Sequence, residues 1–134
     1  MSFDAALQNF VNSVPECVAA GYVDVSTGML IGAKTIDSHP AEVLDLVAAA
    51  TADLFQGQNV VTIEQVFKRQ RGISNDDSHY FKEIVVFSEN LIHVFQRCKT
   101  YEDHILVAVC RKSANIGMVL TKARMGVAKV EASL

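Results

Sequence analysis

The chain has 134 residues, of which half are apolar and a fifth are charged, and its formal net charge is −3. This length suits one domain, residues 1–134, and the composition excludes a disordered chain. The net charge argues against a nucleic-acid partner, and no apolar run approaches the roughly 20 residues that span a bilayer. Three cysteines without framework spacing, and a start without a signal-peptide pattern, predict a cytoplasmic protein.

The charges are unevenly distributed along the chain. Residues 1–67 hold eight acids and one base, Lys34, whereas residues 68–134 hold seven acids and eleven bases. Such asymmetry marks a basic binding face in some proteins, although a solvated surface is the more common explanation.

Periodicity and turn signals predict the elements of the first half. Pro15 ends a first amphipathic helix, and Ser26-Thr27-Gly28 forms the turn of a β-hairpin. A long helix opens near Pro40 and stops at Gly57. Thr62-Ile63-Glu64-Gln65 has the form of a capping box, so a second short helix is expected to start there. The predicted ranges are a helix over 3–14, strands over 17–25 and 29–34, and a helix over 41–56.

The second half is predicted to be mostly strand. Residues 72–79 are the most loop-like stretch, and strands are expected over 80–87, 91–98 and 104–111. Residues 105–110 are apolar without alternation, so the last strand should be covered on both faces and lie centrally. A final helix begins at about Asn115. The fold class is therefore α/β of the α+β type, with a mostly antiparallel sheet.

The motifs that carry chemistry are weak. Gly28 to Thr35 resembles a phosphate-binding loop, but three residues separate its glycines and Ala33 precedes the lysine. The histidines and cysteines lack zinc-ligand spacing, so no metal and no cofactor is expected. A cysteine nucleophile at Cys98 or Cys110 with His104 as its base stays open, although buried structural thiols are more common.

The helix over 41–56 is the most informative segment. Its polar residues form one narrow stripe, and the rest is apolar over about twice the 100° that one sheet needs. Either other helices of the same chain cover the second side or, as we favour, a second copy does. The residues expected at that dimer interface are Val43, Leu44, Val47, Ala48, Ala49, Leu54 and Phe55.

Three passages together resemble the roadblock/dynein light chain family. Residues 20–31 are similar to its first hairpin, residues 41–55 to its long Ala/Leu-rich helix, and residues 113–119 to the entry into its last helix. The resemblance implies a five-stranded antiparallel sheet with helices on both faces, related to longin and profilin-like folds. It also implies homodimers in which the long helices pack together and the third strands pair. Residues 58–79 depart from the family by inserting a short helix and a loop before the third strand.

The resemblance implies a non-enzymatic dimeric platform that binds a small Ras-like GTPase or tethers a signalling or motor complex. A purely structural subunit and a small enzyme or ligand sensor are the alternatives. Charge reversal at Glu102 and Asp103 is expected to have no effect on partner binding. The residues expected to bind the partner are Glu42, Asp45, Asp53, Lys68, Arg69 and Arg71.

Overall fold

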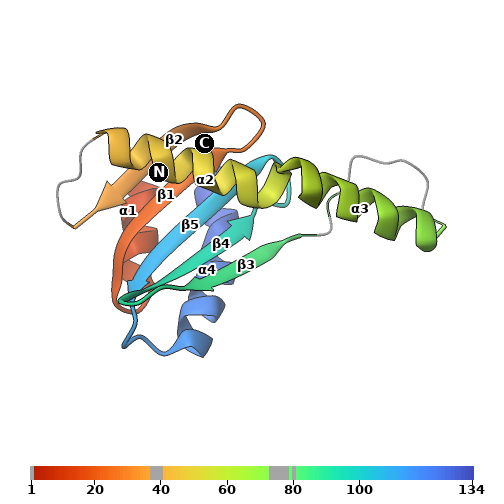
Figure 1. Ribbon diagram of the computed structural model, residues 1–134. Helices are drawn as coiled ribbons and strands as arrows, with labels where there is room; N and C mark the ends of the chain where they lie inside the picture. The colour runs from red at the N-terminus through yellow and green to blue at the C-terminus, as the bar shows by residue number, and fades with distance from the viewer. Residues whose placement is uncertain (1, 37–40, 73–78, 80) are drawn as a thin grey trace.

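The computed structural model describes residues 2–36, 41–72, 79 and 81–134, with only the backbone of residues 41–45. Figure 1 shows one five-stranded antiparallel sheet, in the order β2-β1-β5-β4-β3, with helices on both faces. None of the described helices is long and apolar enough to cross a bilayer. In chain order the elements are α1 (Phe3–Ser13), β1 (Cys17–Asp24), β2 (Met29–Thr35), α2 (Ala41–Gln56), α3 (Gln58–Gln70), β3 (Glu83–Phe87), β4 (Leu91–Arg97), β5 (His104–Arg111) and α4 (Ile116–Ala132).

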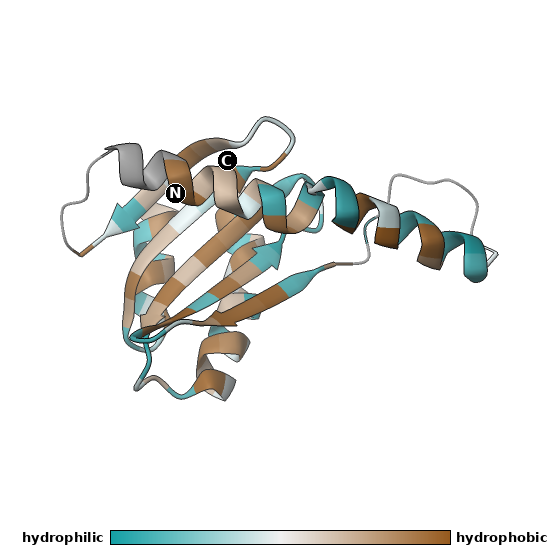
Figure 2. Cartoon of the chain, viewed as in Figure 1, coloured by the Kyte–Doolittle hydropathy of each residue, from teal (hydrophilic) through white to brown (hydrophobic). Residues whose placement is uncertain are grey.

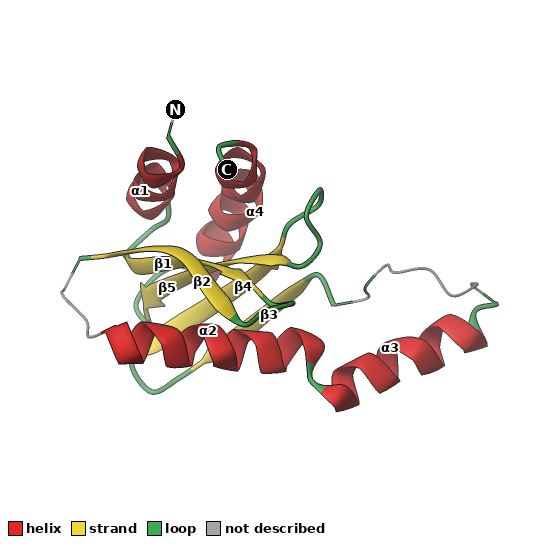
Figure 3. Ribbon diagram, turned by 90° about the horizontal axis from the view of Figure 1, so that it is seen from above, coloured by secondary structure: helices red, strands yellow, loops and turns green. Residues whose placement is uncertain are grey.

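The helices α1 and α4 cover one face of the sheet side by side (Figure 3). Each starts on a side-chain cap: Ser2 accepts a hydrogen bond from the Ala5 amide, and Asn115 from the Met118 amide, both at 3.1 Å. The two helices approach closely at Gly126, where an added Cβ would lie 2.5 Å from the Phe10 ring. This glycine therefore lets the ring of α1 pack directly on the backbone of α4.

The strand β5 lies at the centre of the sheet and is buried on both faces, as its continuous apolar run predicts. Leu106 and Ala108 belong to the core under α1 and α4, whereas Ile105 and Val107 belong to the core under α2. Successive side chains of a strand point to opposite faces, so one strand supplies both cores.

The start of α3 and the length of β3 differ from the sequence prediction. The capping-box expectation for Thr62–Gln65 is wrong, because α3 begins at Gln58 and Thr62 lies inside it, donating to the Gln58 carbonyl at 2.9 Å. Gly57 separates α2 from α3, and a Cβ there would lie 2.6 Å from the Asp53 carbonyl oxygen. The described part of the third strand starts at Glu83 rather than at residue 80. The expectation for Pro40 and most of the predicted loop over 72–79 lie outside the described residues.

Candidate partner-binding surfaces

The helix α2 has an inner face that packs on the sheet. Ala48, Thr51 and Phe55, spaced one helical turn apart, are almost completely buried. Thr51 satisfies its hydroxyl within the helix by donating to the Val47 carbonyl at 2.8 Å. The inner face therefore needs no partner beyond the chain's own sheet.

The outer face of α2 is apolar and open. Leu46 is 70% exposed, and Val47 and Leu54 are also exposed, with Ala49 and Ala50 between them. The helices α1 and α4 lie on the opposite face of the sheet (Figure 3), so they do not cover α2. The outer part of the wide apolar arc that the sequence predicts is thus exposed in the structure.

The sequence prediction of dimer contacts on α2 divides between these two faces. Val47, Ala49 and Leu54 lie on the open side. Ala48 and Phe55 belong to the core under α2 and leave no surface for a second chain, so their assignment to an interface is corrected. The helical period explains the division, because Ala48 and Phe55 are seven residues apart and share the face that the sheet covers. The side chains of Val43 and Leu44 lie outside the described part of the chain.

A shallow apolar groove of about 430 Å³ continues this open face toward the edge of the sheet. Ala50, Asp53 and Leu54 line one wall, and Val86, His93 and Phe95 line the other. β3 is an edge strand of the sheet, and its Val86 and Phe87 are exposed. The outer face of α2, this groove and the edge of β3 together form the surface that we call the open face.

His93, on β4, contributes an imidazole to the wall of the groove. Burial lowers the pKa of its imidazole, and its Nε2 atom lies 3.3 Å from the Ser88 hydroxyl. The neutral ring is thus favoured there, as suits an apolar groove.

The helix α3 continues end to end from α2 and extends beyond the sheet (Figures 1 and 3). Figure 2 shows apolar residues recurring along both helices. On α3, Ile63 is 43% exposed and Phe67 is 46% exposed, and Glu64 is the one buried side chain of this helix. Most of α3 therefore stands outside the core.

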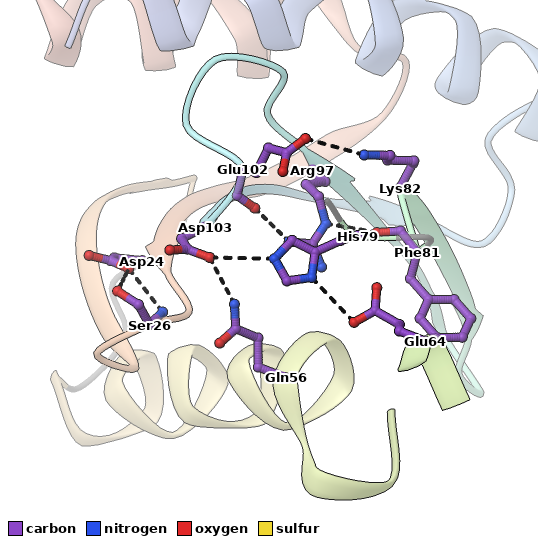
Figure 4. Close-up of polar contacts among 10 residues, drawn as sticks. All are labelled: Asp24, Ser26, Gln56, Glu64, His79, Phe81, Lys82, Arg97, Glu102 and Asp103. Atoms are coloured by element: carbon purple, nitrogen blue, oxygen red, sulfur yellow. Dashed lines mark hydrogen bonds and ion pairs between the residues drawn. The ribbon is translucent and has the colours of Figure 1, made fainter. Parts of the chain in front are cut away.

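A buried arginine connects α3 and the end of α2 to the sheet (Figure 4). Arg97 is 4% exposed, and its guanidinium lies 5.1 Å from the centre of the Phe55 ring. Its Nε donates to the Phe81 carbonyl at 2.8 Å and its Nη1 to the Glu102 carbonyl at 2.6 Å. Its Nη2 is buried and has no hydrogen-bond acceptor in the described part of the chain.

Acidic side chains surround this arginine. Burial lowers the pKa of Arg97, and the nearby carboxylates, Glu64 foremost, oppose that shift. His79 lies between two of them, with Nδ1 3.2 Å from Glu64 and Nε2 3.9 Å from Asp103. Gln56, at the end of α2, donates to Asp103 at 2.9 Å. We call Arg97, Glu64, His79, Asp103 and Gln56 the polar hub; a polar pocket of about 880 Å³ opens beside it.

The hub was not predicted from the sequence, and it changes one expectation. The Asp103 carboxylate accepts a hydrogen bond from Gln56 at the end of α2, and the Glu102 carboxylate lies 3.5 Å from Lys82, so reversing either charge disturbs a contact within the chain. Neither residue is suited to serve as a neutral control for partner binding. Little in the sequence indicated the hub, because an arginine at the end of an apolar strand is usually exposed and Arg97 is buried.

The charged residues predicted to bind a partner are spread along α2 and α3. Asp53 is exposed at the rim of the groove, whereas Arg69 and Arg71 are exposed at the far end of α3. Lys68 lines the polar pocket. The side chains of Glu42 and Asp45 lie outside the described residues. The structure thus separates Asp53 from the basic residues by most of the length of α3.

Cys98 and Cys110 are buried thiols, and Cys17 is half-buried. Cys98 donates to the Tyr22 hydroxyl at 3.5 Å, and that hydroxyl lies 2.9 Å from Nδ1 of His104, so Tyr22 stands between this thiol and the proposed base. Burial raises the pKa of Cys98 to about 11, which disfavours the thiolate that a nucleophile needs. Cys17 and Cys110 face each other across β1 and β5. Within the described ranges, no three His, Cys, Asp or Glu side chains form a candidate metal site.

Comparison with known proteins identifies the fold. No family model and no curated protein matches the sequence. The gliding protein MglB of Thermus thermophilus superposes with a TM-score of 0.69 over 98% of this chain and 87% of its own, at 17% identity. A Roadblock/LC7 domain of Streptomyces avermitilis gives 0.68 over 98% and 97%, at 14% identity. MglC of Myxococcus xanthus gives 0.59 over all of both chains, at 22% identity. The chain thus has a roadblock-type fold, as the sequence resemblance implied.

Proposed function

We propose that this chain is a non-enzymatic binding module that pairs with a second copy through its open face. The observation that carries the proposal is the exposed apolar outer face of α2. Large exposed apolar patches on a small domain mark interaction surfaces. A paired arrangement covers Leu46, Val47 and Leu54 and closes the groove against β3.

The small residues of α2 suit such pairing. Ala49 and Ala50 are exposed between the larger apolar side chains, so two antiparallel helices can approach closely there. The edge of β3 offers backbone groups that a second β3 can pair with, extending the sheet across both copies. The same symmetric contact is the one that the roadblock resemblance implies.

The partner that best fits such a dimer is a small Ras-like GTPase. This class comes from the roadblock resemblance, and charges of both signs at Asp53, Arg69 and Arg71 suit reversible protein recognition. A dimer that contacts the switch region of a GTPase binds one nucleotide state more tightly, and by that difference it regulates its partner.

A pair of adjacent substitutions on α2 tests the dimer. Ala49 is exposed on the outer face, whereas Ala48 is buried against the sheet. Ala49→Glu should yield a folded monomer, because it places a charge in the contact between copies. Ala48→Glu should unfold the domain, because it buries an unpaired charge. Light scattering after gel filtration, with circular dichroism, measures both results. A wild-type chain that stays monomeric at high micromolar concentration contradicts the proposal.

A second experiment tests the partner class and separates a regulator from a purely structural subunit. Extracts of the source cells are supplied with either GDP or a non-hydrolysable GTP analogue, so that their GTPases are held in one nucleotide state. The immobilised wild-type chain then captures GTPases from each extract. A regulator retains a GTPase in one nucleotide state more than in the other. Equal capture in both states, or no GTPase at all, supports the structural subunit instead.

A further inference from the structure

Two cysteines lie opposite each other on neighbouring strands of the sheet. Cys17 is the first residue of β1 and pairs with Cys110, near the end of β5. Figure 1 shows these two strands side by side. Both side chains are on the face that α1 and α4 cover, where Cys110 belongs to the buried core and Cys17 packs against that core. The fold thus brings together two thiols that most of the chain separates in sequence.

The hydrogen bonds around this pair set its spacing. The Arg111 amide donates to the Glu16 carbonyl at 3.0 Å, and these two residues flank the cysteines. The cysteines therefore form a non-hydrogen-bonded pair, in which opposite Cα atoms of antiparallel strands are about 4.5 Å apart. A disulfide joins Cα atoms that are about 4.4–6.8 Å apart. The strands therefore hold the two cysteines close enough to be joined without a movement of the backbone.

The turn that leads into β1 fixes this register. Glu16 has a φ of 51°, in the left-handed region that few residues other than glycine adopt. Its carbonyl accepts the hydrogen bond from Arg111, and its carboxylate accepts one from the Ser113 hydroxyl at 2.8 Å. A strained residue persists only where its surroundings fix it. Here those surroundings also place Cys17 beside Cys110.

The two thiols differ in exposure and in acidity. Cys17 is half-buried, whereas Cys110 is completely buried. The hydrogen bond from the Cys110 thiol lowers the pKa of the Cys17 thiol more than burial raises it. The same contact and burial raise the pKa of Cys110. Because the thiolate is the form that attacks an oxidant, Cys17 is the reactive thiol of the pair.

We propose that Cys17 and Cys110 form a reversible dithiol–disulfide site that a small hydroperoxide oxidises. With hydrogen peroxide, the Cys17 thiolate attacks one oxygen, the O–O bond breaks, and a sulfenic acid forms as hydroxide leaves and takes up a proton. The Cys110 sulfur then attacks the Cys17 sulfur, and the displaced hydroxyl leaves as water with the Cys110 proton. Two thiols lose two electrons, and the peroxide becomes two molecules of water. A low-molecular-weight thiol reverses the reaction by exchange.

The third cysteine provides a control within the same molecule. Ile92 is the residue of β4 that pairs with Cys110, and the stretch from Ile92 to Cys98 extends roughly 20 Å along the chain. Cys98 is buried, and burial raises the pKa of its thiol. It therefore has neither a neighbouring cysteine nor the acidity that the proposed reaction uses. The site lies on the opposite face of the sheet from the open face, so the proposed dimer does not bear on it.

Peptide mapping of the full chain tests the site. The reduced protein is treated with a small molar excess of hydrogen peroxide, the remaining thiols are blocked with N-ethylmaleimide, and the chain is digested with trypsin without reduction. Cleavage after lysine and arginine leaves the three cysteines on different peptides. The expected product is a link between Cys17 and Cys110 within one chain, with Cys98 blocked by N-ethylmaleimide. Dithiothreitol should restore both thiols.

Three results would each overturn the proposal. One is a chain in which Cys17 and Cys110 both remain blockable after the treatment. Another is a link from either of them to Cys98. The third is a link that joins two chains, which non-reducing electrophoresis detects as a covalent dimer.

A pair of variants tests the order of the two steps. Cys110→Ser keeps a small side chain with a donor beside Cys17 but removes the thiol that resolves the sulfenic acid. Dimedone, which labels sulfenic acids, should therefore label Cys17 in this variant after peroxide treatment. Cys98→Ser, the matched control, should form the link as the wild-type chain does and gain no label. A Cys110→Ser chain that is folded by circular dichroism and stays unlabelled at Cys17 overturns the proposed order, and the wild-type map decides the site if this variant does not fold.

Discussion

The two faces of the sheet are built differently. Under α1 and α4 a large core buries side chains from both helices and from β1, β4 and β5. Under α2 the core is smaller, and among the described side chains of the helix Ala48 and Phe55 are the buried apolar ones in it. The far side of α2 and the edge of β3 remain apolar and exposed, whereas the exposed large apolar side chains of α4 are Met118 and Met125. In the described part of the chain, one face is thus covered by helices and the other keeps an exposed apolar surface.

This contrast separates stability from recognition. Side chains between the sheet and the α1–α4 layer exclude water within one copy, so they determine the free energy of unfolding. Side chains of the open face lose their water only when another chain covers them. Substitutions under α1 and α4 should therefore change the free energy of unfolding, whereas substitutions on the open face should change association with another chain. Four experiments test this difference, from the largest expected effect to the smallest.

The largest effect is expected from truncating an aromatic ring in the core under α1 and α4. Phe10 is 3% exposed beneath α4, so Phe10→Ala should lower the free energy of unfolding by about 3–5 kcal/mol. Phe87 is 59% exposed on β3, and Phe87→Ala should change the stability of the isolated chain by about 0.5 kcal/mol or less. Urea denaturation below the dimer dissociation constant measures both. Equal losses would contradict the contrast between the faces.

The next effect concerns the polar hub. Arg97→Met keeps an apolar stem over Phe55 but removes the donors to the carbonyls of Phe81 and Glu102. We expect a loss of about 2 kcal/mol, because buried acceptors are left without donors. Hydrogen exchange should rise in α3 and at the end of α2 and stay unchanged in α1. Faster exchange throughout the chain would show that Arg97 stabilises the whole domain and not the junction.

A smaller, pH-dependent effect is expected at His93. Burial lowers the pKa of this imidazole below that of the unfolded chain, so the unfolded state binds more protons between the two values. Stability should therefore fall as the pH drops below about 6.5. His93→Gln should reduce the difference in free energy of unfolding between about pH 7.5 and pH 5.5. An unchanged difference would show that other groups cause the acid sensitivity.

The smallest effect is expected from a surface charge. Asp53→Lys, at the rim of the groove, should slow association with the captured GTPase several-fold at low salt and leave the melting temperature unchanged. Glu89→Lys, in the exposed turn between β3 and β4, is the control. Association kinetics measured at two salt concentrations test this. Identical behaviour of the two variants would place the GTPase on another surface.

The sequence predicted the order of the elements where periodicity is strong. The ranges of α1, β1, β2 and β5 agree with the structure to within one residue at each end. The double-sided apolar pattern of residues 41–56 likewise predicted the open face. These features depend on which residues are apolar, and a helical or strand period reports that directly.

Other features depend on contacts between distant segments, which no local pattern reports. The hub joins Gln56, Glu64, His79, Arg97 and Asp103 from separate parts of the chain. The start of α3 was misplaced because Thr62 and Gln65 imitate a capping box, while Gly57 already interrupts the helix. Ala48 and Ala49 are chemically identical in the sequence, and only the packing of α2 on the sheet distinguishes them.

The exposed edge of β3 has a consequence for the handling of this protein. Within the described part of the chain β3 is an edge strand, and with the exposed side chains of Val86 and Phe87 it is a template onto which other extended chains add. Natural edge strands are usually blunted by proline or lysine, and residues 83–87 contain neither. In the proposed dimer the second copy covers this edge, so an unpaired copy carries an aggregation hazard. The Ala49→Glu variant, which is expected to stay unpaired, should therefore lose more protein to aggregation than the wild-type chain at equal concentration.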